Sequence, residues 1–322
     1  MTKENYIKGI PFAIIALFLV SLQPIVANSR PEVLDSYIFA AMTCIIQVPI
    51  FFPMVLVERK QIRASIDLDP TLFEEKSQLL NGWKKNKLFL IYIGIIFAIA
   101  QVLFFIAYQY AGAINGSLAQ QTIIIFGLLF GFLINHEKVS YKQIIFSVIL
   151  FFGLFLAVTQ GKFNLIEFNI GILLMLLICM MWMSAHALSK RIFDKNEITP
   201  VQLIFIRNFI SGSILISTYF IFYPLENIKL FFNPINILFF IMMGFLYGFD
   251  VVCWYKTLEY IEISKATVLV SPMPILTAIF AFFILGESFT IFHLIGTFII
   301  IFSIIIIVRE KPNVNKQREE KF

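Results

Sequence analysis

The chain has 322 residues, of which 59% are hydrophobic and 14% are charged, and its formal net charge is +5. Soluble domains are about half apolar and about a quarter charged, so this composition excludes an ordinary soluble globular protein and predicts that lipid is the solvent. The basic excess is concentrated in a few connecting segments, which argues against a nucleic-acid partner and for a membrane topology signal.

Ten apolar segments are each long enough to cross a bilayer as a helix, which takes about 20 residues. They cover residues 9–27, 36–57, 88–110, 113–134, 141–159, 167–188, 200–222, 235–258, 264–284 and 290–308. No small-residue cleavage site follows the first segment, so we expect a retained helix rather than a signal peptide. The mixed charges of 58–87 predict a water-exposed connection. The sequence therefore predicts an all-α integral membrane protein with ten transmembrane helices.

Lysine and arginine are distributed unequally between the two sides that these helices define. If the N-terminus is cytoplasmic, 21 of the 25 basic residues lie in cytoplasmic segments, and three (Arg30, Lys162 and Lys229) lie outside. Basic residues accumulate on the cytoplasmic side of membrane proteins. We therefore predict a multi-pass protein of the cell membrane with both termini in the cytoplasm and a charged cytoplasmic tail at 309–322.

A segment of the first half recurs 150 residues later. AYQYAGAINGS (107–117) aligns with TLEYIEISKAT (257–267), and INHEKVS (134–140) aligns with ILGESFT (284–290), so that Tyr110 meets Tyr260 and Glu137 meets Glu287. Five predicted spans precede the second copy, and an odd number reverses its direction in the membrane. This pattern predicts an inverted repeat of the kind found in secondary transporters, with one unit at 1–160 and the other at 161–308.

These motifs resemble those of the EamA family in the drug/metabolite transporter superfamily. A further similarity is LLICMMWMSAHALSKR (176–191) followed by TPVQLIFIRNF (199–209). The resemblance implies a ten-helix carrier that alternates between inward-open and outward-open states, with helices one to four and six to nine around a central cavity. Relatives export amino acids and other metabolites, or carry nucleotide sugars and phosphorylated sugars.

Two departures from the family pattern lie in the first half. His136 stands where the family usually has glycine, and near Thr43 there is no arginine to match Arg207. We therefore expect the two halves to contribute unequally to the binding site.

Arg207 and Asp250 are the charged residues that remain well inside the predicted spans. At 1.5 Å per residue, both lie about 10 Å from the same end of their helices. Helices joined by a short connection are usually neighbours, so an ion pair between them is a reasonable hypothesis. Two roles are open for this pair. It could brace two helices, or it could face the cavity and exchange partners with substrate or with a proton. The remaining alternative is that the two side chains do not pair.

Other candidate residues of the substrate pathway are polar or aromatic. They are Gln101, Gln120, Trp182, His186, Tyr247 and Ser271, with Trp254 as a further part of an aromatic wall. The alternative for each is structural, because buried amides often form interhelical hydrogen bonds and aromatic side chains usually pack. Pro272 and Pro274 predict a kink that faces the cavity, and no matching break is expected at QTII (121–124).

Rival functions find little support in the motifs. The chain has no HExxH motif, no Walker loop and no sizeable soluble region, so we expect neither an enzyme nor a cofactor or bound metal. Cys44, Cys179 and Cys253 lie in apolar runs and are expected to pack. A channel would call for a symmetric ring of polar groups.

The sequence thus predicts a transporter that exports amino acids or similar small amphipathic compounds. Nucleotide sugars, phosphorylated sugars and drug-like compounds are the alternative substrates, and a single inward arginine argues against a polyanion. The expected partners are the small-molecule substrate and the lipid bilayer, with protons as a candidate coupling ion. The protein is expected to be a monomer or a weak homodimer.

Overall fold

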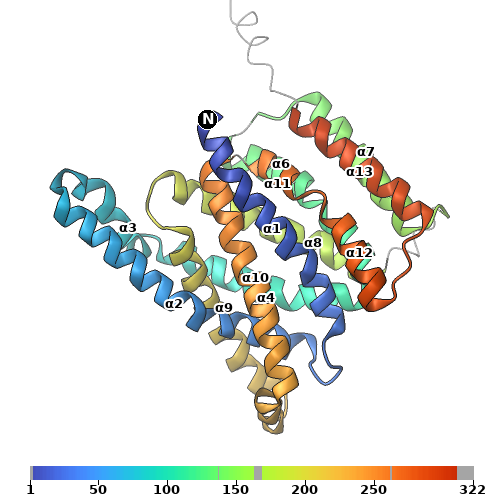
Figure 1. The fold of residues 1–322 in the computed structure, drawn as a ribbon, viewed down its shortest axis with the longest axis horizontal. Coiled ribbons are helices and arrows are strands. Elements are labelled where there is room, and N and C mark those ends of the chain that lie inside the picture. Colours follow the sequence, from blue (N-terminus) through green and yellow to red (C-terminus); the bar gives the residue numbers. More distant parts are fainter. Residues whose placement is uncertain (1–2, 137, 163–168, 262, 310–322) are drawn as a thin grey trace, which may run out of the picture.

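The computed structural model describes residues 3–136, 138–162, 169–261 and 263–309, and these ranges form α-helices with two 3₁₀ segments and no strands (Figure 1). The first half contains α1 (Lys3–Ser29), α2 (Ser36–Leu68), η1 (Pro70–Leu72), α3 (Phe73–Lys85), α4 (Lys87–Ala111), α5 (Ala113–Gln120), α6 (Ile123–Asn135) and α7 (Tyr141–Val158). The second half contains α8 (Ile170–Asp194), α9 (Pro200–Phe222), η3 (Leu225–Phe232), α10 (Pro234–Tyr260), α11 (Ile263–Val270), α12 (Met273–Leu285) and α13 (Ile291–Arg309).

Eight helical segments within the described ranges are long and apolar enough to cross a membrane. One of these segments, Ala113–Asn135, consists of α5 and α6 together. Two shorter apolar helices follow at Met273–Leu285 and Ile291–Ile307. The predicted class of all-helical, multi-pass membrane protein is therefore confirmed.

Side-chain caps fix where five of the helices begin. The N-cap residues Asp35, Ser140, Asn169, Thr199 and Asn233 each accept a hydrogen bond from a backbone N–H of the first turn. Such a cap satisfies donors that have no partner within the helix and contributes about 1 kcal/mol. The polar residues at the edges of the apolar segments thus set the helix ends.

The helices of the two halves pack in matching ways. Helix α1 packs against α10 and α12, and α8 packs in the same way against α4 and α6. Helix α2 contacts α10, α9 contacts α4, and α2 and α9 pack against each other. Each of these contacts made by a helix of the first half therefore has a counterpart made by the equivalent helix of the second.

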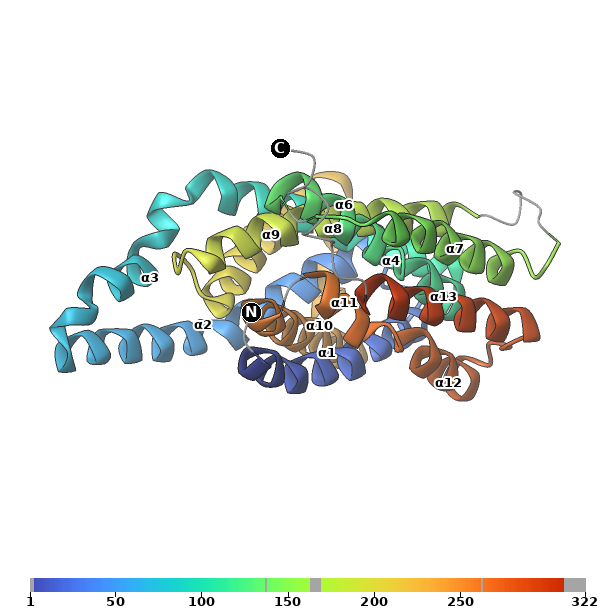
Figure 2. The same ribbon diagram turned by 90° about the horizontal axis from the view of Figure 1, so that it is seen from above.

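Helices α7 and α13 lie side by side at one edge of the bundle and contact each other extensively (Figures 1 and 2). A Cβ atom on Gly296 would lie 2.6 Å from the carbonyl oxygen of Gly153, so the two glycines allow a close helix crossing. The Gln143 amide donates to the carbonyl of Ile307 at 2.9 Å, which joins the start of one helix to the end of the other.

The segment 58–87, predicted as a polar connection, is largely helical. Helix α2 continues to Leu68, because the sequence from residue 54 to residue 69 contains no proline or glycine, and α3 then returns towards the bundle. Figures 1 and 2 show this arm projecting from one side. Its end is tied to the second half, where Glu197 accepts hydrogen bonds from Lys85 and, at 2.9 Å, from Asn86.

Two helices are interrupted at equivalent positions. Helix α11 ends at Val270 and α12 begins at Met273, so the predicted break at Pro272 is present, and Pro274 lies in the first turn of α12. The expectation of no matching break at 121–124 is wrong, because α5 ends at Gln120 and α6 begins at Ile123. There the backbone N–H of Thr122 bonds to the carbonyl of Ala119 at 3.1 Å, and the Thr122 hydroxyl donates to the same oxygen at 2.8 Å. This tight turn forms without a proline.

The histidine that replaces a glycine of the motif keeps the backbone of its counterpart. His136 ends α6 with φ of 56°, and Gly286 ends α12 with φ of 68°. A left-handed conformation costs a non-glycine residue about 1–2 kcal/mol, so the substitution changes the strain and not the geometry.

Candidate binding cavity

A cavity of about 70 Å³ lies between the two halves, lined by residues of α1, α4, α5, α6, α8, α10, α11 and α12. No described residue of α2, α7, α9 or α13 lines it. Both helix breaks border it, through Gln121 on one side and through Val270 and Met273 on the other. Irregular backbone inside a membrane protein is tolerated where it faces such a cavity.

Asp250 of α10 faces this cavity and is only half-buried. Its Oδ2 accepts a hydrogen bond of 2.9 Å from the Nε2 of Gln23 on α1, and Gln23 also lines the cavity. Because α1 and α10 pack closely, this bond connects the first half to the second. Among the described lining residues, Asp250 is the only acidic one and none is lysine or arginine.

Arg207 of α9 is fully buried and does not line the cavity. Its guanidinium carbon lies 4.1 Å from the centre of the Phe97 ring, and its Nη2 donates to the Oδ1 of Asn208 at 3.3 Å. The Nε and Nη1 atoms have no hydrogen-bond partner in the described part of the chain. Asn208 in turn donates to Gln47 of α2 at 2.7 Å.

The hypothesised ion pair between Arg207 and Asp250 is absent, since within the described ranges no Arg207 nitrogen lies within 4.0 Å of an Asp250 carboxylate oxygen. The physical reason is that α2 packs against both of their helices, which contact each other far less. Cβ atoms on Gly212 of α9 and Gly244 of α10 would lie 2.9 Å and 2.7 Å from the side chains of Ile45 and Ile46 of α2. The expectation that consecutive helices are close neighbours is therefore wrong for this pair.

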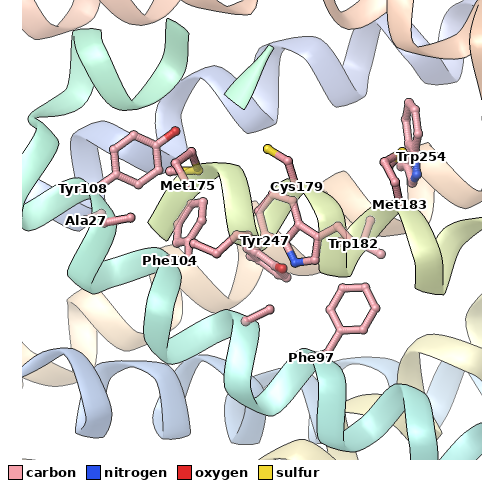
Figure 3. Packing of buried hydrophobic residues seen from close by; sticks show 14 of the residues in the cluster. Ala27, Phe97, Phe104, Tyr108, Met175, Cys179, Trp182, Met183, Tyr247 and Trp254 are labelled. Carbon is pink, nitrogen blue, oxygen red and sulfur yellow. The ribbon is translucent and has the colours of Figure 1, made fainter. Parts of the chain in front are cut away.

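Aromatic side chains form much of the remaining wall. The Phe104 ring lies behind it, 5.6 Å from Trp182 and 6.0 Å from Tyr247, both of which line the cavity (Figure 3). His186 lies edge-on to Phe97 at 5.7 Å and to Trp254 at 5.9 Å.

Three nitrogens of this wall have no hydrogen-bond partner in the part of the chain that the structure describes. They are the Nε1 atoms of Trp182 and Trp254 and the Nδ1 of His186. A buried polar group without a partner costs free energy, so this wall carries polar strain next to the cavity.

The structure brings together only some of the residues that the sequence singles out. Gln120, Trp182, His186, Tyr247 and Asp250 line the cavity, and the Oε1 of Gln120 accepts a hydrogen bond of 2.7 Å from Tyr108. Gln101, Ser271 and Arg207 are buried outside the lining.

Gln23, Phe97 and Gln121 line the cavity but are absent from the set of predicted site residues. Gln23 could have been selected as an amide in the interior of an apolar helix. Phe97 carries no such signal, because the chain contains 38 phenylalanines.

The residues of the repeated motif have structural contacts. The Glu287 carboxylate accepts hydrogen bonds from the backbone N–H groups of Ala113 at 2.7 Å and Ile114 at 2.9 Å, at the start of α5. A carboxylate at a helix N-terminus satisfies two donors and interacts favourably with the helix dipole. Tyr260 ends α10 and stacks on Phe12 with ring centres 6.4 Å apart. The matching Tyr110 is exposed near the end of α4.

Glu137, the partner of Glu287 in the alignment, lies outside the described residues, as does the tail after residue 309. Within the described ranges, no group of three or more His, Cys, Asp or Glu residues could hold a metal ion.

Comparisons with known proteins agree with the repeated architecture. The sequence pattern of the EamA-like transporter family matches residues 7–159 and again residues 169–309. A solved structure described only as "Crystal structure of protein" superposes with a TM-score of 0.65 at 12% sequence identity, over 99% of this chain and 100% of that one. At this identity the likeness shows a shared fold. No curated protein matches the sequence.

Proposed function

The chain belongs to the EamA-like transporter family, and from this premise we propose that it is a secondary transporter that moves a small metabolite by alternating access. The observation that carries the proposal is the cavity between the two halves, bordered by two interrupted helices at equivalent positions. Such interruptions lie at the substrate sites of many secondary transporters.

The transporter has ten spans in two inverted repeats of five. The first repeat comprises α1, α2, α4, the α5–α6 pair and α7, and the second comprises α8, α9, α10, the α11–α12 pair and α13. Support comes from the two matches to the family, the matching helix contacts and the equivalent breaks. The excess of basic residues on one side supports a cell-membrane location with both termini in the cytoplasm.

Amino acids or similar small amphipathic compounds are the first choice of substrate, and export is the proposed direction. The wall of the cavity combines aromatic rings, amides and one carboxylate. Nucleotide sugars and phosphorylated sugars are less well supported, because no described lysine or arginine faces the cavity to bind phosphate.

Protons are the proposed coupling ion, and Asp250 is the proposed site of protonation. It is the one acidic residue among those described along the cavity, and it lies inside a predicted span, where ionisable groups usually serve function. If this is right, the exchange that Asp250→Asn still carries out at saturating substrate no longer responds to a pH gradient. Full transport with an unchanged pH response would contradict the proton role.

Purified protein in proteoliposomes tests the transport function. Saturable exchange of a radiolabelled substrate across the bilayer supports a carrier. A linear current–voltage relation without exchange supports a channel and would refute the proposal. An exchange rate that saturates also excludes simple leakage, which grows linearly with concentration.

A further inference from the structure

We infer that the cavity selects compounds that carry an ammonium group on an apolar body, and that it does not require a carboxylate on the substrate. The inference rests on the proposed transport function and names the class of substrate that the cavity binds.

The ammonium requirement comes from Asp250. Its Oδ2 accepts a hydrogen bond from Gln23, and no described side chain donates a hydrogen bond to its Oδ1. No arginine or lysine nitrogen is paired with it in the described ranges. A carboxylate held away from bulk water is strongly stabilised by a cation at close range. A protonated amine in the cavity would supply that cation and a charge-assisted hydrogen bond.

The position of Arg207 explains why the substrate does not need a carboxylate. This arginine is the charged group that could receive an anion, yet it is fully buried and lies 4.1 Å over the ring of Phe97. Phe97 itself lines the cavity, whereas Arg207 does not. A substrate carboxylate would therefore meet Asp250 but no described cation, and its charge would lower affinity.

The apolar body is favoured by the aromatic side chains. Trp182, Tyr247, Trp254 and Phe97 line the cavity. Aromatic faces attract cations as well as apolar groups.

Four related compounds separate the contributions of the amine and the carboxylate. Phenethylamine carries the amine alone, phenylalanine carries both groups, 3-phenylpropanoate carries the acid alone, and 2-phenylethanol carries neither charge. We expect titration calorimetry on the purified full-length protein to rank phenethylamine first, phenylalanine second, and the other two at least about tenfold weaker, as the loss of a charge-assisted hydrogen bond implies. Equal binding of the acid and the amine, or no amine binding at millimolar concentration, would overturn the inference.

Variants then assign the selectivity to Asp250. Asp250→Asn should weaken phenethylamine about 10- to 100-fold and leave 2-phenylethanol unchanged, whereas Asp67→Asn, at an exposed position of α2, should change neither. Unchanged amine affinity in Asp250→Asn would refute the role of this carboxylate. If that variant does not fold, Asp250→Glu and the ranking by the native protein still decide the question.

These experiments can refute the transport function and the proposed ligand class independently of each other. Amine binding without flux in proteoliposomes would refute the transport function and leave the ligand class standing. Saturable flux of 3-phenylpropanoate at the same rate as phenethylamine would leave the transport function standing and refute the ligand class.

Discussion

The guanidinium of Arg207 lies 4.1 Å from the centre of the Phe97 ring, and the same ring forms part of the cavity wall. Phe97 therefore stabilises a buried cation and also forms part of the cavity surface. Removing the ring should have two effects: the protein loses the cation–π contact, and the guanidinium becomes accessible to anions.

We expect Phe97→Leu to lower the free energy of unfolding by about 2–3 kcal/mol, combining a lost cation–π contact with a smaller buried side chain. The control is Phe240→Leu, which changes a buried phenylalanine whose ring contacts no cation among the described residues. Thermal melting in detergent measures the stability, and calorimetry measures binding. Only Phe97→Leu should gain affinity for 3-phenylpropanoate. The same gain in both variants would contradict a specific role of the Phe97 ring.

The broad fold could be predicted from the sequence, because apolar segments of about 20 residues directly indicate helices that cross a lipid bilayer. Which helices lie side by side could not. Arg207 and Asp250 have matched depths along their helices, yet the sequence contains no sign that α2 would pack between α9 and α10. Gly212 and Gly244 permit that packing, but a glycine in a membrane helix does not identify its neighbour.

Site residues of a type that is rare in this apolar chain could be predicted, and those of a common type could not. Asp250 and Trp182 stand out by residue type in an apolar chain, and both line the cavity. The break at Gln121 and Thr122 was missed because hydrogen bonds of the Thr122 side chain and backbone, rather than a proline, set the turn. Threonine and glutamine also occur inside uninterrupted helices, so the residue types at 121 and 122 do not by themselves signal a break.

A double-mutant cycle tests whether Arg207 and Asp250 interact directly. The two side chains form no ion pair among the described residues, so Arg207→Met and Asp250→Asn should change stability nearly additively, with a coupling below about 1 kcal/mol. Reversible denaturation in mixed detergent measures the four free energies of unfolding. A coupling of about 3 kcal/mol or more would indicate a buried brace between them and would contradict the observed separation.

Glu287 should contribute to stability by joining the two halves. Its carboxylate accepts from Ala113 and Ile114 at the start of α5, and hydrogen bonds to a charged acceptor contribute about 1.5–3 kcal/mol each. We expect Glu287→Ala to lower the free energy of unfolding by about 2–4 kcal/mol and Glu287→Gln by less, because one amide oxygen can still accept. The exposed Glu226→Ala is the control. Equal melting temperatures for Glu287→Ala and Glu226→Ala would show that the cap has no energetic role.

The contact between the α3 arm and the second half should depend on pH through Glu197, which lies in the connection between α8 and α9. Burial raises the pKa of this carboxyl, but hydrogen bonds from Lys85 and Asn86 outweigh that effect and hold the pKa below its ordinary value of 4.5. The unfolded chain therefore binds the proton more readily than the folded one. The stabilisation is fully present above pH 4.5 and is lost as the pH falls through the folded-state pKa.

Glu197→Gln should accordingly be less stable than the native protein at pH 7, and the difference should shrink between about pH 5 and pH 3 as the native carboxylate is protonated. Melting temperatures across this range measure the difference, and Glu74→Gln, at an exposed position of α3, controls for general acid effects. Lys85→Met should also make the stability of the protein depend less on pH, because it removes one of the two donors that lower the pKa of Glu197. A constant stability difference from pH 7 to pH 3 would contradict this mechanism, since an uncharged packing role for Glu197 does not change with protonation.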